Sequence, residues 1–207
     1  ILASLKMLDG DFQAATQLVE KALSVNPRDL ELLGHAAAIA ILQDDTLSAG
    51  SYERDAFRTS RTPVEFYITA AEDLALRFRY EKSLEYSLKA VRASPSYPKA
   101  LASAGSSLLR LGRSDEAKGH LERAFRIDQF NLFVGNMLTL IDEYDSFARI
   151  ESENFELILP LSEKDVLGPM ILMEAEAAFA SFSRYYSYQP AGKMSIEAYD
   201  DADDFAV

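Results

Sequence analysis

A spacing of 34 residues recurs through the first two-thirds of the sequence, and it limits the possible folds more than any other feature. In the clearest copy, residues 98–131, apolar residues recur at helical spacing on both sides of a break at Leu111-Gly112-Arg113. This copy therefore predicts two helices joined by a turn that contains glycine. Positions that are 34 residues apart carry small residues in every copy. One such set is Ala15, Ala49, Ser83 and Ala117, and another is Ala22, Ala56, Ala90 and Ala124. Four hairpins of one kind are expected.

A single helical hairpin cannot bury its own apolar faces, so hairpins of this kind are expected to stack. The small residues at fixed positions would let the helices approach closely, and Pro27 and Pro95 would end two of the hairpins. This pattern resembles the tetratricopeptide repeat, in which small residues lie inside each hairpin and proline follows it. The resemblance implies an all-α solenoid with repeats at about 1–29, 30–63, 64–97 and 98–131, covered by a solvating helix at 132–144.

The second repeat is the least regular of the four. Asp29 is expected to cap its first helix at about residues 30–43. Its second half, residues 46–61, contains Gly50 and several serines, and an interior glycine costs a helix about 1 kcal/mol. A short or frayed helix is therefore predicted there.

Charge divides the chain into two parts. Residues 1–140 hold 18 acidic and 17 basic side chains, whereas residues 141–207 hold 15 acidic and 4 basic. The asymmetry predicts two modules, 1–145 and 146–207. No basic face is expected, which argues against binding to nucleic acid. No apolar run reaches 18 residues, so no membrane insertion is expected.

The acidic second module is predicted to be a β-α-β segment. Residues 155–160 alternate and end at Pro160, residues 163–186 carry an apolar helical stripe, and residues 193–199 alternate again. Two strands and one helix seldom complete a core, so a small, incomplete α+β module and a truncated chain are expected. The stretches FELILP, VLGPMILMEAEAAFASFSRYYSYQP and MSIEAYDDADDFAV resemble the start of a peptidase-MA-like (gluzincin) metallopeptidase domain. The resemblance implies an HExxH motif further along a longer chain, and residues 1–207 contain none.

Motifs for chemistry are missing from the sequence, so no catalytic residue, cofactor or metal site is predicted. The two histidines, His35 and His120, lie in different repeats, and packing or surface roles are expected for both because of this spacing and because no carboxylate is expected to neighbour either ring. The aspartates of residues 200–204 lack the glycine and the glutamate of a calcium-binding loop. A solvated helix start is the expected role for them.

The tetratricopeptide resemblance also implies a groove, because the first helix of each such hairpin lines the concave face and holds peptide ligands. By the repeat offset, protein-binding residues are predicted at Glu65, Ile68, Glu72, Leu76, Lys99, Ala102, Ser106 and Arg110. Lys99 and Arg110 would bind an acidic group of a peptide through charge-assisted hydrogen bonds. Alternatively, they would pair with Glu65 and Glu72, or would be exposed charges on a solvated face without a ligand. Ser106 stands where some relatives carry an asparagine that clamps a peptide carboxylate, so that form of recognition is not expected.

Three functions remain open at this stage. The first is a non-catalytic protein–protein interaction scaffold that binds a peptide or partner protein in the groove. The second is the substrate-recruiting part of a zinc metallopeptidase whose catalytic motif lies outside this chain. The third is a structural spacer or oligomerisation unit.

Overall fold

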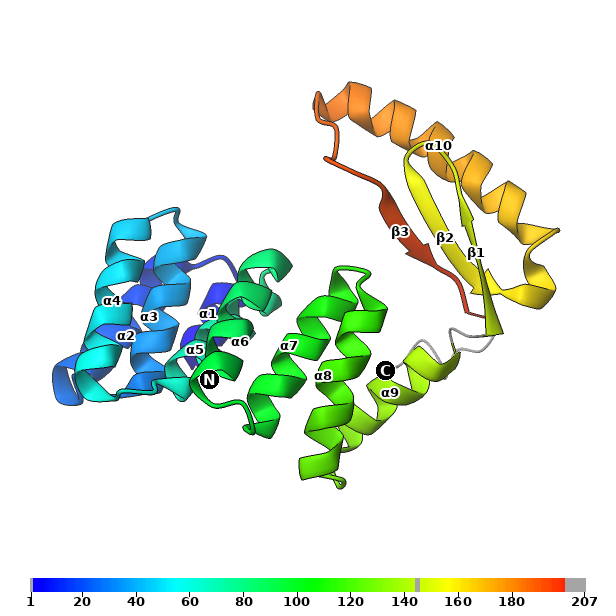
Figure 1. Cartoon of the computed structure of the whole chain (residues 1–207). Coiled ribbons are helices and arrows are strands. Elements are labelled where there is room, and N and C mark those ends of the chain that lie inside the picture. The colour runs from blue at the N-terminus through cyan, green and yellow to red at the C-terminus, as the bar shows by residue number, and fades with distance from the viewer. Residues whose placement is uncertain (1, 144–145, 200–207) are drawn as a thin grey trace. The chain divides into compact units, whose positions relative to one another are not determined.

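The computed structural model describes residues 2–143 and 146–199, and its first part is a series of antiparallel helix pairs (Figure 1). The pairs are α1 (Leu2–Leu8) with α2 (Phe12–Val25), α3 (Leu30–Leu42) with α4 (Thr46–Thr59), α5 (Val64–Leu76) with α6 (Tyr80–Ala93), and α7 (Pro98–Arg110) with α8 (Ser114–Ile127). Each pair contacts the next, since α3 packs on α5 and α6 packs on α7. The predicted all-α solenoid, followed by a small α+β segment, is confirmed.

One backbone feature repeats in every hairpin at the end of the first helix. The residue there has a left-handed conformation, with φ of 77° at Gly10, 61° at Asp44, 58° at Phe78 and 71° at Gly112. The amide of the next residue then donates to a carbonyl five positions back, as Arg79 does to Leu74 at 3.0 Å and Arg113 does to Leu108 at 2.9 Å. This is the Schellman arrangement that ends helices, and it explains why glycine is favoured at this position.

Phe78 has a left-handed conformation at a position that favours glycine, so its backbone is strained. Replacing it by glycine tests this strain. A side chain in the left-handed region costs roughly 1–2 kcal/mol, and Phe78 is 73% exposed, so its ring contact with Tyr80 offsets only part of that cost. We expect Phe78→Gly to raise the free energy of unfolding by about 1 kcal/mol in urea titrations. Asp44→Gly should raise it less, because aspartate tolerates this conformation better. A lower stability of Phe78→Gly would contradict this explanation.

The core of the repeats lies between paired helices and is densest around α5. Phe66, Ile68 and Leu74 of α5 are almost fully buried, as are Leu101 and Leu108 of α7. The small residues predicted to permit close packing are buried as expected, namely Ala15, Ala49, Ala56, Ser83, Ala90, Ala117 and Ala124. Ile127, an apolar residue at the end of α8, is 51% exposed.

The helix predicted to be short or frayed is complete, so that prediction was wrong. Helix α4 runs over 14 residues, Thr46–Thr59, through Gly50. Asp45 caps it by accepting a hydrogen bond from the amide of Ser48 at 3.0 Å, and Ala56 is fully buried. A capping bond and apolar packing together outweigh the roughly 1 kcal/mol penalty of one interior glycine. The predicted cap at Asp29 is confirmed, with bonds from the amides of Glu31 and Leu32.

The chain divides into two compact units, residues 1–134 and 135–207. The division falls inside α9 (Leu132–Glu143) rather than near residue 145, where the charge asymmetry had placed it. That α9 covers the last repeat stays a prediction.

The second unit contains a three-stranded sheet rather than the two strands that were predicted. The additional strand is β1 (Phe147–Glu151), which pairs antiparallel with β2 (Phe155–Pro160), while β3 (Met194–Glu197) pairs parallel with β2. Helix α10 (Leu167–Tyr186) covers one face of this sheet, where Ile171 and Leu172 pack near Leu157 and Leu159. The element order is therefore β-β-α-β.

Helix α10 begins later than the sequence analysis predicted. A 3-10 turn occupies Leu161–Glu163, and the α-helix starts at Leu167. Pro169 explains the shift, because proline is tolerated in the first turn of a helix but disrupts an interior position. Two apolar residues of the predicted helical stripe at 163–186, Leu167 and Phe182, are exposed by 41% and 60%. Residues 200–207, whose aspartates were expected to form a solvated helix start, lie outside the described residues.

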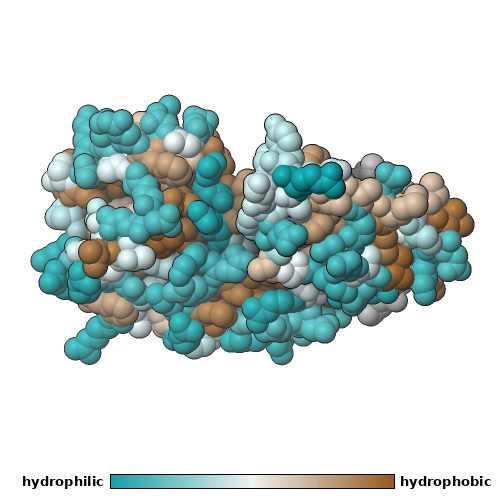
Figure 2. Space-filling model, turned by 90° about the horizontal axis from the view of Figure 1, so that it is seen from above, coloured by the Kyte–Doolittle hydropathy of each residue, from teal (hydrophilic) through white to brown (hydrophobic). Residues whose placement is uncertain are grey.

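The surface is mostly hydrophilic in the view of Figure 2, with smaller hydrophobic areas between the charged side chains. Among the described residues, no helix is long and apolar enough to cross a membrane.

Candidate protein-binding groove

A groove of about 1010 Å³ lies along α5 and α7, and we call it the α5–α7 groove. Both helices are the first of their hairpins, which is where the repeat pattern placed the binding surface. Its lining residues are Leu8, Glu72, Ala75, Leu76, Phe78, Tyr80, Ser83, Tyr97, Pro98, Lys99, Ala102, Ser103, Ser106, Ser107, Arg110, Asp128, Asn131 and Phe133.

Most of the groove surface is apolar. Leu76 and Phe78 are exposed by 43% and 73%, and Phe133 by 55%, so large hydrophobic side chains face solvent here. Ala102 is buried and leaves depth between them because it has no side chain beyond its Cβ. An exposed apolar surface that is concave and has polar groups at its border is typical of a binding site.

The two basic residues of the groove, Lys99 and Arg110, differ in whether they form an ion pair. Lys99 of α7 forms an ion pair with Glu72 of α5, with 3.0 Å between the ammonium nitrogen and a carboxylate oxygen. Of the alternatives for Lys99, the structure therefore shows pairing within the groove. Arg110, at the other end of α7, is exposed and has no ion pair among the residues described. The groove thus offers one guanidinium that is available for a ligand.

The eight residues predicted from the repeat offset do not all reach this groove. Six of them line it, namely Glu72, Leu76, Lys99, Ala102, Ser106 and Arg110. Glu65 is exposed on α5 but is not among the lining residues. Ile68 is only 2% exposed and belongs to the apolar core, so its side chain is not available to a ligand.

Several lining residues were missed by the sequence analysis, and one of them follows from the repeat. Leu8 lies 68 residues before Leu76, which is two repeat lengths, and it occupies the same repeat position. Arg77, directly after α5, donates to the carbonyl of Leu8 at 3.0 Å, which brings the end of α1 to this groove. The other missed residues include four aromatic ones from turns and helix starts, namely Phe78, Tyr80, Tyr97 and Phe133. The repeat offset was applied only to the first helix of each hairpin, so it did not predict them.

Serine hydroxyls join the helices beneath the groove. Ser83 of α6 donates to the carbonyl of Ala71 at 2.8 Å and lies 2.9 Å from the hydroxyl of Ser107 on α7. Ser87 and Ser103 form a second pair at 2.7 Å. Because these hydroxyls bond to one another, they satisfy their polar groups while keeping α6 and α7 close.

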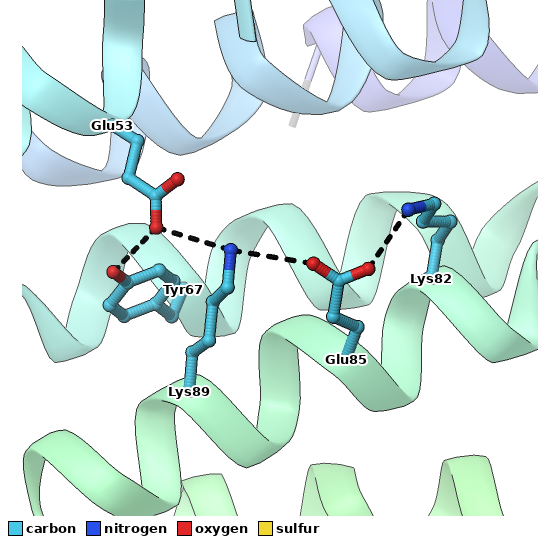
Figure 3. Close-up of polar contacts among 5 residues, drawn as sticks. All are labelled: Glu53, Tyr67, Lys82, Glu85 and Lys89. Atoms are coloured by element: carbon cyan, nitrogen blue, oxygen red, sulfur yellow. Dashed lines mark hydrogen bonds and ion pairs between the residues drawn. The ribbon is translucent and has the colours of Figure 1, made fainter. Parts of the chain in front are cut away.

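A polar network connects α4, α5 and α6 on another surface of the repeats (Figure 3). The carboxylate of Glu53 accepts from the hydroxyl of Tyr67 at 2.7 Å and from Lys89 at 3.2 Å, and Lys89 also pairs with Glu85. Burial, followed by the bond to Glu53, raises the pKa of Tyr67. Burial and the charges of Glu53 and Glu85 raise the pKa of Tyr86 to about 12. Both phenols therefore stay protonated at neutral pH, and the network acts as a structural link between repeats.

The two histidines occupy different environments. The imidazole Nδ1 of His35 on α3 lies 2.5 Å from the carboxylate of Asp73 on α5, which is only 3% exposed. The expectation that no carboxylate would neighbour it was wrong, because the partner is 38 residues away in sequence. Burial, followed by the charge of Arg123, lowers the pKa of His120. Among the described residues, no group of three or more histidine, aspartate or glutamate side chains could hold a metal ion.

Comparison with known proteins supports the repeat assignment. Residues 98–131 match the family model of the tetratricopeptide repeat. This match does not reach residues 146–207, so their resemblance to peptidase-MA-like domains stays a prediction. The comparison with curated proteins gives no match.

Several solved structures match this chain at low sequence identity. The crystal structure of MamA has a TM-score of 0.47 and 17% identity, and the match covers 70% of this chain and 85% of that one. PilF of Pseudomonas aeruginosa has a TM-score of 0.45 and 18% identity, over 70% and 68% of the two chains. TTC0263, a thermophilic tetratricopeptide-repeat protein of Thermus thermophilus, has a TM-score of 0.44 and 21% identity, over 68% and 77%.

The architecture and the family match agree over residues 98–131, the hairpin of α7 and α8. The repeated hairpins, the left-handed residue in each turn and the buried small residues are found from α1 to α8. The chain is thus an all-α solenoid of helical hairpins followed by a small α+β segment, and its residues 98–131 match the tetratricopeptide repeat.

Proposed function

We propose that this chain is a non-catalytic protein–protein interaction scaffold, and that the α5–α7 groove binds a peptide segment of a partner protein. The observation that carries this proposal is the exposed apolar surface of the groove, which combines about 1010 Å³ of space with large uncovered side chains. Burying such side chains against a ligand contributes about 25 cal/mol for each Å² removed from water. The groove lies along two neighbouring first helices, which suits an extended or helical peptide.

The polar groups of the groove would orient the ligand. Arg110 has no ion pair among the described residues and would bind a carboxylate of the peptide, whereas Lys99 is already occupied by Glu72. Apolar residues of the peptide would pack on Leu76, Phe78 and Phe133. A suitable ligand is therefore a peptide with hydrophobic side chains beside one acidic group.

A substitution that fills the groove with a larger side chain tests this proposal. The full chain would first be used to select ligands from a random-peptide display library, and the affinity of one selected peptide would be measured by fluorescence anisotropy. Ser106 lines the groove, so Ser106→Tyr places a ring in the space of the peptide and should weaken binding at least tenfold. The matched control is Ser24→Tyr on α2, an exposed serine outside the lining, which should leave the affinity unchanged. Equal affinities for the two variants would refute the groove as the binding site.

A further inference from the structure

Helix α10 packs on the sheet with one side only (Figure 1). Ile171 and Leu172 pack on that side, near the buried residues of the sheet. On the other side, Met170, Met173 and Tyr185 are exposed by 57%, 63% and 80%. Large apolar side chains that gather on one exposed helix face indicate a docking surface. We call this side the outer face of α10, and it consists of Met170, Met173, Glu174, Ala177, Ala180, Ser181, Arg184 and Tyr185.

The sizes of the side chains on the outer face are nearly symmetric about residue 179. Large apolar side chains lie towards both ends, with Met173 six residues before this point and Tyr185 six residues after it. The middle carries small side chains, among them Ala177 and Ser181. The hydroxyl of Ser181 donates to the carbonyl of Ala177 at 3.0 Å, so its polar group is satisfied within the helix. A second helix could therefore approach closely at the middle and make apolar contacts at both ends.

The two charges of the outer face follow the same symmetry with opposite signs. Glu174 lies five residues before position 179, and Arg184 lies five residues after it. Both side chains are exposed, and neither forms an ion pair within the part of the chain that the structure describes. They lie roughly 15 Å apart along the helix axis, because a helix rises about 1.5 Å per residue, so they cannot pair with each other. An antiparallel copy of the helix that crosses at residue 179 would place its Arg184 beside Glu174 and its Glu174 beside Arg184.

We propose that the outer face of α10 binds a second copy of this chain, through an antiparallel pair of α10 helices related by a two-fold axis beside residue 179. Met173 would then pack on Tyr185 of the partner subunit, and Ala177 would face Ser181 of the partner subunit. Every contact occurs twice in a two-fold interface, so the two charged groups form two ion pairs between the copies. The outer face is complementary to itself in charge, in size and in apolar character under this single operation. This surface lies outside the α5–α7 groove, and the proposal does not depend on peptide binding there.

Sedimentation equilibrium of the full chain over a wide range of concentrations tests whether the dimer forms. The buffer contains about 0.15 M salt, which screens the repulsion between two acidic chains beyond about 8 Å. We expect a reversible equilibrium between monomer and dimer with a micromolar dissociation constant, because one pair of helices buries less surface than an interface of standard size. A chain that stays monomeric at all concentrations would overturn the proposal.

Charge reversal then locates the interface. Glu174→Arg would place two arginines together at each end of the helix pair, and Arg184→Glu would place two glutamates together. Each variant alone should therefore dimerise at least tenfold more weakly than the unchanged chain. The matched control is Glu153→Arg, which makes the same change of charge at an exposed residue outside the outer face and should dimerise as the unchanged chain does.

A mixture of the two single variants tests the antiparallel arrangement itself. When Glu174→Arg is mixed with Arg184→Glu, each end of the helix pair again joins opposite charges. With one variant fluorescently labelled, the mixture should form a heterodimer about as tightly as the unchanged chain forms its homodimer. A mixture that stays monomeric, or a control that loses as much affinity as the single variants, would refute this interface.

Discussion

Replacing His35 by leucine should lower the free energy of unfolding by about 3–5 kcal/mol, because it leaves the buried carboxylate of Asp73 without its partner. Asp73 is only 3% exposed, so water cannot take the place of the imidazole, and the carboxylate keeps the full cost of its burial. The loss is large against the roughly 5–15 kcal/mol that stabilises a typical domain. Urea unfolding of the full chain, followed by far-ultraviolet circular dichroism, measures it.

A second replacement distinguishes the unpaired charge from a simple packing defect. Position 73 corresponds to Ile39 in the preceding repeat, where isoleucine is 3% exposed, so the fold accepts an apolar side chain at this place. His35→Leu/Asp73→Ile should therefore recover most of the stability that His35→Leu loses. A loss below about 1 kcal/mol for the single variant, or no recovery in the double variant, would contradict this account of the pair.

Adding one methyl group at Gly34 should destabilise the contact between α3 and α5. A Cβ atom there would lie 2.7 Å from the carbonyl oxygen of Phe66 and 2.9 Å from the Cβ of Thr69, and neither is the end of a flexible side chain. The two helices would have to move apart, and overpacking of this kind costs about 1–3 kcal/mol. Thermal or urea unfolding of Gly34→Ala measures the effect.

Gly119 in α8 provides the matched control, because a Cβ there meets nothing within 4 Å. Both variants gain the helix preference of alanine over glycine, about 1 kcal/mol, so only the overpacking differs between them. Gly119→Ala should be more stable than the unchanged chain, and the two variants should differ by about 1–3 kcal/mol. Equal stabilities would show that α3 and α5 are not held as closely as described.

The repeat architecture could be predicted from the sequence because its signal is periodic. The small residues Ala117 and Ala124 recur at fixed intervals, and each of them is buried against a neighbouring helix. The same offset leads to six of the groove residues, since helices at equivalent positions present equivalent faces. It fails at Ile68, because the offset identifies the helix but does not distinguish its solvent face from the face packed on α3 and α6.

The remaining features depend on contacts that no local pattern reveals. His35 and Asp73 are paired although they belong to different repeats, and Glu53 meets Lys89 across 36 residues. Helix α4 tolerates Gly50 because a capping bond and tertiary packing stabilise it. The strand β1 was missed because it is only five residues long, which gives a short alternation, and it is held by pairing with β2.

The most direct test of the proposed function is a crystal structure of the full chain with a peptide selected for binding to it. We predict that the peptide lies along α5 and α7, contacts Leu76 and Ala102, and places a carboxylate beside Arg110. A peptide bound on any other surface, with the α5–α7 groove empty, would contradict the proposal.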